Sequence, residues 1–578
     1  MFKQFKYIVL TAFTGTVCQT YAQERKQTND TIDTQVVTVV KPYTPTISDA
    51  FKIKEEPTLD DKTTATKKEV KYNIFSIPVA STFTPAKGKA EAVAKTKSVK
   101  LYDNYASLGL GTYTTILGEV YLNHKLSNTE TVGGYFSHHS SQGGIDGLLL
   151  DDKFSNTHLH ANFTQRQRDY TWRVDGGGKF LTYNWYGLLQ PYFDGTTAND
   201  LNVKHAFYNA NVGGKITFDD AIAEEASLRF RHFGDNKGSG ENRLLVKGTF
   251  GIPVMDETIK TEVTVDYLGG AFERNYYSED KLEYGNFNVG LAPSYQLVQD
   301  DLTLNLGIGL VYLNNTKDGD NKLYIYPNIT GSYRLVDELM IAFGGIEGRL
   351  IQNSYEDFAM ENPFVSPTLL VVPTDQQYNA TLGVKGKLTN TIGYSVSGNY
   401  TADRNKALFK ANSVLGEATE DYQYGNSFGV VYDDVKTFSF EGELSVDINR
   451  NFNLGAKAAY FMYNTNNQDE AWNLPELKAS LFADYQITEQ WFAGASLFYV
   501  GERKDVFYEE GTLILPIEET RTLDGYFDVN LHAGYRVNEK LSIFLKGNNL
   551  FNQDYERWMH YPVQGLQILG GATYQFDF

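Results

Sequence analysis

Histidines are the residues of this chain best suited to metal chemistry, and four of them form two closely spaced pairs. His158 and His160 are two residues apart in NTHLHANF, so on a strand both side chains point to one face. His138 and His139 are adjacent, so on a strand they point to opposite faces and cannot share an ion. A zinc site needs at least three protein ligands, and the sequence supplies no clear third one. KDGDNK (317–322) lacks the length and spacing of a calcium loop, so we expect no metal and no other cofactor.

Carboxylates are the other candidates, because a positioned pair could act in acid–base catalysis. Five of them alternate with apolar residues in two segments: Glu262, Asp266, Glu441, Glu443 and Asp447. The chain has no GxSxG motif, no paired Asp–His arrangement and no glycine-rich phosphate loop in a supporting context. A solvated or ion-paired strand face accounts for these carboxylates, so we expect no catalytic residue and no enzyme.

Period-2 patterning in the surrounding segments indicates strands. It is clearest in TIKTEVTVDYLGG (258–270), DLTLNLGIGLVYL (301–313) and TFSFEGELSVDI (437–448). Successive side chains of a strand point to opposite faces, so one face of each segment is apolar and the other polar or charged. In a soluble sandwich the apolar face would be the core, whereas in a transmembrane barrel it faces lipid and the polar face lines the lumen.

Composition favours the barrel. Aromatic residues make up 14% of the 578 residues, with 40 Tyr, 36 Phe and 51 Gly. After the N-terminus, no stretch approaches the roughly 20 apolar residues that a membrane helix requires. An outer-membrane β-barrel spreads its apolar residues over alternate positions instead. The formal net charge of −19 argues against nucleic-acid binding, and a secreted soluble β-protein is the alternative at this point.

The first 22 residues predict a cleaved signal peptide. Lys3 and Lys6 precede an apolar run, and small residues lead to Ala22. Cys18 would permit lipid attachment as an alternative, but the residues before it match a lipoprotein signal poorly. Cleavage after Ala22 would leave a mature chain without cysteine and therefore without disulfides.

The spacing of the remaining segments predicts one large barrel over residues 101–578. Short turns rich in Asn, Asp and Glu recur, for example at 126–132 and 536–541, and they alternate with long polar connections at 351–377, 404–421 and 503–522. We count about 22 strands, which fits a barrel with a wide lumen. Its fold class is therefore an all-β membrane protein with a single antiparallel transmembrane barrel.

Residues 23–100 differ from the barrel segments. Five prolines interrupt them, Thr and Lys are abundant, and no sustained periodicity is present. We expect an extended N-terminal segment that is too irregular to form a folded plug domain. Something must nevertheless occupy so wide a lumen, and the candidates are this segment, inward-folded loops such as 351–377, or a partner protein.

The C-terminus carries a local signal. ATYQFDF places Tyr574, Phe576 and Phe578 on one face of a final strand. Barrel-assembly machinery reads such an edge strand by main-chain pairing, with alternate aromatic side chains filling pockets. The simpler alternative is one more lipid-facing strand.

Two motifs resemble TonB-dependent receptors of the Gram-negative outer membrane. The closing strands of that family match at these positions: Asn549, Leu550, Phe551, Tyr555, Pro562, Gly565 and Phe576. Leu566 departs from the arginine usual after that glycine. A loop with Asn362, Pro363 and Pro367 resembles the family's mid-barrel loop. The resemblance implies an outer-membrane barrel that takes part in ligand binding or transport.

TIDTQVVTVV (31–40) resembles the TonB box of that family. The matching residues are Asp33, Thr34, Val36, Val37 and Val39. Such a Val-rich stretch could add as a strand to TonB or to another periplasmic protein, with residues 31–51 as the contact region. Any extended valine-rich segment would look similar, so kinship is better supported than active coupling.

Two functions therefore remain open. The first is a transport-class receptor barrel whose plug is missing or replaced. The second is a non-transporting scaffold subunit of an assembly, secretion or surface-display complex, with surface lipoproteins or other envelope subunits as partners. Outer-membrane lipid and the barrel-assembly machinery are expected partners in both cases.

Overall fold

The computed structural model describes residues 100–578, except 189–192, 194–197, 199, 220, 450 and 510–516. The expected signal peptide, the TonB-box-like stretch and the rest of the N-terminal segment up to residue 99 lie outside the described residues. The account below therefore concerns the barrel.

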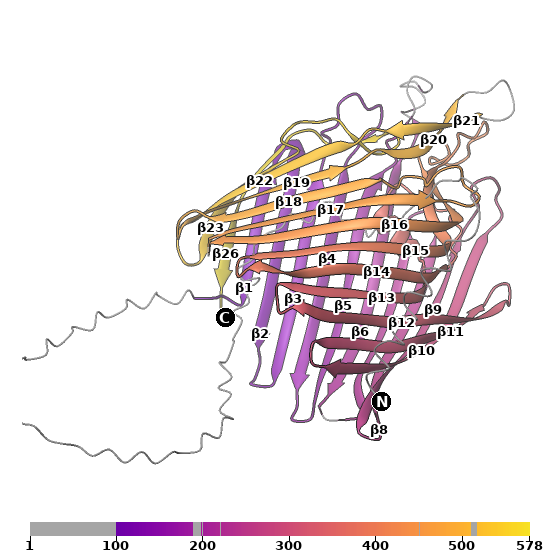
Figure 1. Cartoon of the computed structure of the whole chain (residues 1–578). Helices are drawn as coiled ribbons and strands as arrows, with labels where there is room; N and C mark the ends of the chain where they lie inside the picture. The colour runs from indigo at the N-terminus through magenta and orange to yellow at the C-terminus, as the bar shows by residue number, and fades with distance from the viewer. Residues whose placement is uncertain are drawn as a thin grey trace, which may run out of the picture. The chain divides into compact units, whose positions relative to one another are not determined.

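The described chain forms a 22-stranded antiparallel sheet that closes on itself (Figure 1). The first half of the ring is β1 (Asn104–Gly111), β2 (Thr115–Lys125), β3 (Glu130–Ser141), β4 (Phe154–Arg166), β5 (Tyr170–Asn184), β6 (Lys204–Phe218), β7 (Ala223–Asp235), β8 (Gly240–Val254), β9 (Glu257–Phe272), β10 (Leu282–Gln299) and β11 (Leu302–Asn315). The second half is β12 (Asn321–Val336), β13 (Met340–Ile351), β14 (Thr374–Thr389), β15 (Ile392–Ala411), β16 (Phe428–Asn449), β17 (Phe452–Asn464), β18 (Leu477–Gln486), β19 (Trp491–Val500), β22 (Tyr526–Arg536), β23 (Leu541–Asn548) and β26 (Gln567–Phe576).

The ring closes where β1 pairs with β26, in a register that runs from Asn104 opposite Phe576 to Gly111 opposite Leu569. Strands adjacent in the ring are consecutive in the chain, apart from two hairpins that stand outside it. These are β20 (Arg503–Glu509) with β21 (Ile517–Leu523), and β24 (Glu556–Trp558) with β25 (Tyr561–Pro562). The predicted fold class and the strand number of about 22 are thus confirmed.

Alternation along each strand sorts side chains to the two faces as the pattern predicts. On β9, the outward Tyr267 is 41% exposed, while the inward Asp266 is 6% exposed and lies 2.6 Å from Arg243 of β8. On β11 and β12 the outward face carries exposed Leu306 and Ile325. Because paired residues share a face, one polar set lines the lumen all round the ring.

The two ends of the barrel differ. One end has only short turns, such as 300–301 and 337–339, in which Asp300 and Asp337 adopt φ values of 49° and 40°. Aspartate tolerates this left-handed conformation, which a tight hairpin turn needs. The other end has the long connections. Two of these are more regular than the sequence suggests: β15 continues to Ala411, so the connection expected at 404–421 covers 412–427, and the connection expected at 503–522 contains the β20–β21 hairpin.

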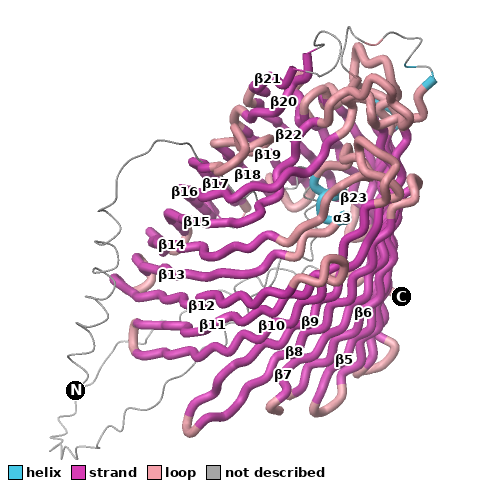
Figure 2. Tube along the Cα trace, turned by 90° about the vertical axis from the view of Figure 1, so that its right-hand side faces the viewer, coloured by secondary structure: helices cyan, strands magenta, loops and turns pink. Residues whose placement is uncertain are grey.

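The connection between β13 and β14 turns inward and carries the helix α3 (Tyr355–Glu361), which lies inside the ring of strands (Figure 2). Ser354 caps it by accepting a hydrogen bond from the Asp357 amide, and Glu356 and Asp357 complement the positive end of the short helix. The helix ends at Asn362, before Pro363, as expected because a residue that precedes proline disfavours helix. A short 3-10 turn, η2 (Thr112–Thr114), joins β1 and β2. No helix in the described part has the length and apolarity needed to cross a bilayer.

Candidate functional site

The long connections meet in one hydrophobic core that crosses the mouth of the barrel. Trp185, after β5, packs on Tyr422 of the 412–427 connection with ring centroids 5.3 Å apart. The Asn426 side-chain amide of the same connection donates to the Trp185 carbonyl at 3.1 Å. In the strand order, β5 and β16 lie on opposite sides of the ring, so these contacts bridge the lumen.

A second bridge joins the β23–β26 connection to the same core. Tyr561 stacks on Phe364 of the β13–β14 connection, with ring centroids 3.8 Å apart and an interplanar angle of 23°. The Tyr186 hydroxyl donates to the Pro562 carbonyl at 2.9 Å. We call the residues 185–188, 352–373, 412–427 and 556–562 the loop cap.

Burial of large aromatic rings stabilises the loop cap. Trp185 and Tyr355 are 0% exposed, and Tyr422 and Tyr561 are 1% exposed. Each buried aromatic side chain contributes roughly 2–3 kcal/mol before the entropy of ordering the loops is subtracted. Such a core holds the connections together as one packed layer and not as separate mobile loops.

Helix α3 attaches the loop cap to the inner wall. Its first residue, Tyr355, fills a pocket formed by Phe207, Phe233 and Phe272, with ring centroids of the last two at 5.1 and 4.9 Å. The Tyr355 hydroxyl donates to Asp235 Oδ2 at 2.6 Å. Burial, together with the neighbouring carboxylate, raises the pKa of Tyr355 well above its ordinary value, so the hydroxyl keeps its proton and remains a donor.

Charged groups surround the acidic turn of the helix. Arg231 of β7 is paired with the buried Glu241 at 3.0 Å and reaches Glu356 through Nε at 2.8 Å, an ion-pair contact without good hydrogen-bond alignment. Lys179 Nζ of β5 is 3.4 Å from Glu356, and Asn209 Nδ2 donates to the same carboxylate at 3.0 Å. The wall therefore supplies two hydrogen-bond donors and one further cation to one 5% exposed carboxylate.

Two further contacts complete this attachment. Arg243 of β8 pairs with Asp266 and has Nη1 3.9 Å from Asp357. Glu241, 1% exposed, accepts from the Tyr355 amide at 2.6 Å and from the Tyr284 hydroxyl at 2.8 Å. Buried charges of this kind are stable only when nearly all their hydrogen-bonding groups are satisfied, so the helix and the wall form one coupled network.

Two titratable side chains in the hairpins outside the ring, Asp505 and His560, have strongly shifted pKa values. Asp505 of β20 accepts from the Ala411 amide and from Asn473 Nδ2, at 3.0 and 2.7 Å, and joins three neighbouring segments. Burial raises its pKa to about 6 despite those hydrogen bonds. Burial lowers the pKa of His560, between β24 and β25, to about 4, so this imidazole is neutral at physiological pH.

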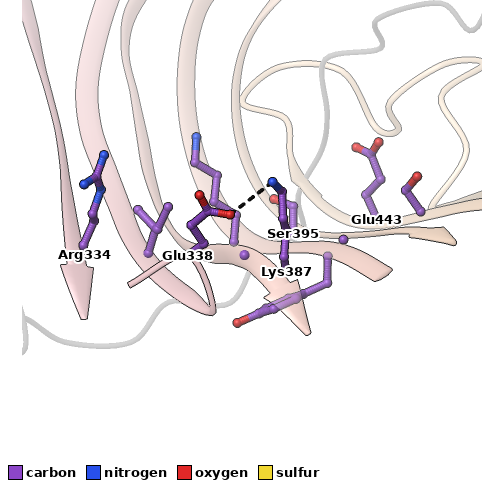
Figure 3. Close-up of a pocket in the computed structure, with 11 residues that line it drawn as sticks. Arg334, Glu338, Lys387, Ser395 and Glu443 are labelled. Carbon is purple, nitrogen blue, oxygen red and sulfur yellow. Dashed lines mark hydrogen bonds and ion pairs between the residues drawn. The ribbon is translucent and has the colours of Figure 1, made fainter. Parts of the chain in front are cut away.

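At the short-turn end, the inner wall of β12–β16 is hollowed (Figure 3). The hollow has a volume of about 480 Å³, and its charged lining is Arg334, Glu338, Lys385, Lys387 and Glu443. Lys387 pairs with Glu338 at 3.2 Å, and their side chains are 63% and 79% exposed. These charges are solvated, in contrast with those around α3.

The histidines singled out in the sequence do not form a site with three ligands. His158 and His160 share the inward face, with ring centroids 6.5 Å apart, whereas His138 bonds to Thr157 and His139 packs on Phe154. Within the described ranges, no group of three or more His, Cys, Asp or Glu side chains is arranged to hold a metal ion.

The inward carboxylates have different surroundings. Asp266 pairs with Arg243, Glu262 with Lys247 at 3.4 Å, and Glu441 with Lys457 at 3.9 Å. Glu443 lines the hollow, and Asp447 is exposed on the same strand.

The C-terminal motif shapes the connection that carries β24 and β25. Asn549 adopts φ of 46° and donates to the carbonyls of Gln553 and Gln564 at 3.0 Å. Tyr555 stacks on Tyr526, with ring centroids 3.8 Å apart, and donates to Asp528. A side chain at Gly565 would meet Asn552 Oδ1 at 2.6 Å. These residues direct the chain toward Tyr561 in the loop cap.

The aromatic residues at the C-terminus lie on the outward face. Tyr574 is 47% and Phe578 74% exposed, and Tyr574 and Phe576 stack with ring centroids 5.9 Å apart. This arrangement is compatible with both readings, assembly signal and lipid-facing strand. The residues expected to contact TonB lie outside the described part of the chain.

Sequence reasoning missed the cations that hold α3. Arg231 follows Leu228 and Phe230 of the outward face in SLRFRHFGD, so the period-2 pattern was a signal that this arginine points into the lumen. What the pattern lacked was a reason to connect it with Glu356, which is far away in the sequence.

Comparison with known proteins identifies the family. The family model described as "TonB dependent receptor-like, beta-barrel" matches residues 96–550, which is most of the chain. The protein belongs to this family. Barrels of this family reside in the outer membrane of Gram-negative bacteria, so the outward face of this TonB-dependent-receptor-like barrel faces lipid. No curated protein matches the sequence.

Solved structures confirm the fold of this TonB-dependent-receptor-like barrel. The pyoverdine receptor FpvA from Pseudomonas aeruginosa PAO1 has a TM-score of 0.61 at 13% identity, covering 83% of this chain and 79% of that one. The siderophore receptor PirA from Acinetobacter baumannii gives 0.60 at 13%, covering 83% and 81%. The ferric-catecholate import receptor Fiu from E. coli K12 gives 0.57 at 12%, covering 82% of each chain.

Proposed function

We propose that the protein is a transport-class outer-membrane receptor, whose charged lumen is the ligand path and whose loop cap closes the outer mouth in place of a plug. The observation that carries this proposal is the single core joining connections from opposite sides of the ring, through Trp185, Tyr422, Phe364 and Tyr561. The long connections would face the outside and the short turns the periplasm, the usual asymmetry of such barrels.

The width of the ring makes such a closure necessary. With strands about 4.8 Å apart and tilted by about 40°, a closed ring of 22 strands is roughly 40–45 Å across. An open lumen of that width would admit large solutes. The loop cap supplies a packed layer across it, and its helix α3, bound to the wall, narrows the lumen further.

A permeability measurement tests the closure. The double substitution Trp185→Ala and Tyr561→Ala removes a ring from each of the two bridges, and we expect it to raise uptake of a bulky hydrophilic antibiotic at least severalfold in cells. Tyr277→Ala is the matched control, because this ring lies in the 273–281 connection but is 72% exposed. Unchanged uptake in the double variant, with normal amounts of barrel in the membrane, would contradict the closure.

Coupling through the N-terminal segment is a separate part of the proposal. Deletion of residues 31–40, which include Asp33, Thr34, Val36, Val37 and Val39, should abolish energy-dependent uptake if that stretch adds as a strand to TonB. A scaffold subunit would be indifferent to the deletion and would instead co-purify reproducibly with other envelope proteins in mild detergent. A separate variant that lacks Phe578 tests the assembly signal. It should show less inserted barrel in the membrane if the assembly machinery recognises Tyr574, Phe576 and Phe578.

A further inference from the structure

The wall beside α3 presents three cationic side chains, and the donors that wall carboxylates leave over contact α3 and its N-cap residue Ser354. Lys179, Arg231 and Arg243 project inward from β5, β7 and β8, with side chains 35%, 18% and 20% exposed. Wall carboxylates already pair with both arginines: Glu241 with Arg231 and Asp266 with Arg243. Of the remaining donors, Lys179 Nζ and Arg231 Nε lie 3.4 and 2.8 Å from Glu356. Arg231 Nη1 and Arg243 Nη1 lie 4.0 and 3.9 Å from Asp357.

The α3 side of this contact is acidic and carries no compensating cation. Glu356 and Asp357 are consecutive, and Glu356 is almost fully buried against the wall. If the helix moved away, Lys179 and Asn209 would lose the carboxylate that they share. Arg231 would lose its contacts with Glu356 and Asp357, and Arg243 its contact with Asp357. Leaving partly buried cations without acceptors is costly, so the wall favours an anion at this position.

The donor set defines the chemistry of that anion. Guanidinium groups match carboxylate and phosphate oxygens in a planar fork, and an ammonium group adds a point charge. Two acidic groups on adjacent residues now satisfy these donors, so a ligand would need at least two anionic groups a similar distance apart.

We propose that Lys179, Arg231 and Arg243 form a binding site for a ligand bearing two or more carboxylate or phosphate groups, which Glu356 and Asp357 occupy as internal surrogates. This inference rests on the proposed function, because it takes the lumen as the ligand path. A ligand that replaces the surrogates releases the acidic turn of α3 from the wall. Tyr355 stays in its aromatic pocket, so release loosens the helix without dismantling the loop cap.

Competition between ligand and surrogate gives a direct test. Citrate, pyrophosphate and acetate are titrated calorimetrically, at low ionic strength, into the full chain in detergent micelles. The E356Q/D357N variant lacks both surrogate charges, and we expect it to bind citrate or pyrophosphate at least tenfold more tightly than the wild type. Acetate, with one carboxylate, should gain little.

Two further variants make the test specific. K179Q on the E356Q/D357N background should remove most of the gain, because Lys179 pairs with no carboxylate other than Glu356 among the described residues. E417Q removes an exposed carboxylate from the 412–427 connection and should leave binding as in the wild type. If the double variant does not yield a closed barrel, D357N alone serves, since that side chain is 55% exposed.

The anion that gains more identifies the ligand class, citrate for a carboxylate ligand and pyrophosphate for a phosphorylated one. Absence of tighter binding in a variant that retains the circular dichroism and heat-modifiable mobility of a closed barrel would overturn the proposal. A gain that K179Q does not reduce would also overturn it. Neither result affects closure by the loop cap, which the permeability of the Trp185 and Tyr561 variants measures separately.

Discussion

The inner wall beside α3 and the hollow at the short-turn end are built from the same period-2 pattern, yet their charges behave differently. Arg231 is 18% exposed and lies 2.8 Å from Glu356, whereas Lys387 is 63% exposed and lies 3.2 Å from Glu338. The ion-pair distances are similar, but only the first pair is shielded from water by a helix and an aromatic core. An inward charge therefore becomes part of a rigid network only where another segment covers it.

The largest expected effect comes from Arg231→Gln. It removes a cation shared by Glu241 and Glu356 and leaves two buried carboxylates short of a partner, which costs about 3–5 kcal/mol. We expect amide hydrogen exchange in Tyr355–Glu361 to accelerate by more than a hundredfold. Lys247→Gln is the control on the neighbouring strand, because its pair with Glu262 is half-exposed, and equal acceleration in both variants would refute the distinction.

The pH dependence of the connections should give the next largest effect. The pKa of Asp505 is about 6, above its ordinary value of 3.8, so the folded state binds this proton more tightly than the unfolded state. The contribution of Asp505 to stability therefore falls as pH rises from about 4 to 6, by an amount on the order of 2–3 kcal/mol. Comparison of wild type and Asp505→Asn by hydrogen exchange in β20 should show this slope in the wild type only.

His560 provides a test of opposite sign in the same pH range. Its folded-state pKa of about 4 lies below the ordinary 6.5, so its contribution is fully present above pH 6.5 and is lost as pH falls toward 4. In the His560→Gln variant, stability should therefore change less with pH between about 4 and 6.5. If stability depended on pH in the same way in Asp505→Asn and His560→Gln, neither group would be as buried in solution as in the structure.

A smaller effect is expected for Tyr355→Phe. The substitution keeps the ring in its pocket but leaves the buried Asp235 without a donor at 2.6 Å, at a cost of about 1–3 kcal/mol. His205 still contacts the same carboxylate at 3.2 Å, which limits the loss. Exchange in α3 should rise less than in Arg231→Gln, and an equal rise would mean that the hydroxyl, not the ion pairs, anchors the helix.

Lys387→Gln should have the smallest effect. Exposed ion pairs contribute about 0–1 kcal/mol and are screened by salt. Thermal unfolding of the variant should match the wild type within about 1 °C at physiological salt. A larger shift would show that the hollow is covered in the intact protein, and the contrast between the two wall regions would then fail.

The sequence predicted those features that depend on local alternation. Glu262 and Asp266 were placed on the polar face and Tyr267 on the apolar one, and both assignments hold because the side-chain period of a strand is fixed. Short turns were located correctly because Asp and Asn mark them. The end of β15 and the β20–β21 hairpin were missed, because their apolar residues, such as Leu408 and Phe409, are consecutive in the sequence and give no sustained period-2 pattern.

The candidate site was less predictable for a related reason. Ser354 and the acidic residues after it form a recognisable helix start, but nothing local connects Glu356 with Lys179, which is 177 residues away. The inward-folded 351–377 connection was one of three candidates for filling the lumen, and the sequence offered no means to choose among them.

The sequence by itself determined that this protein is a large closed barrel with a polar lumen, because alternation and turn chemistry are properties of neighbouring residues. Only the tertiary structure decided which lumen charges are buried, and which connections meet across the mouth. Those features arise where strands on opposite sides of the ring bring their connections together, and contacts such as Trp185 with Tyr422 join residues whose distance in the chain carries no periodic signal.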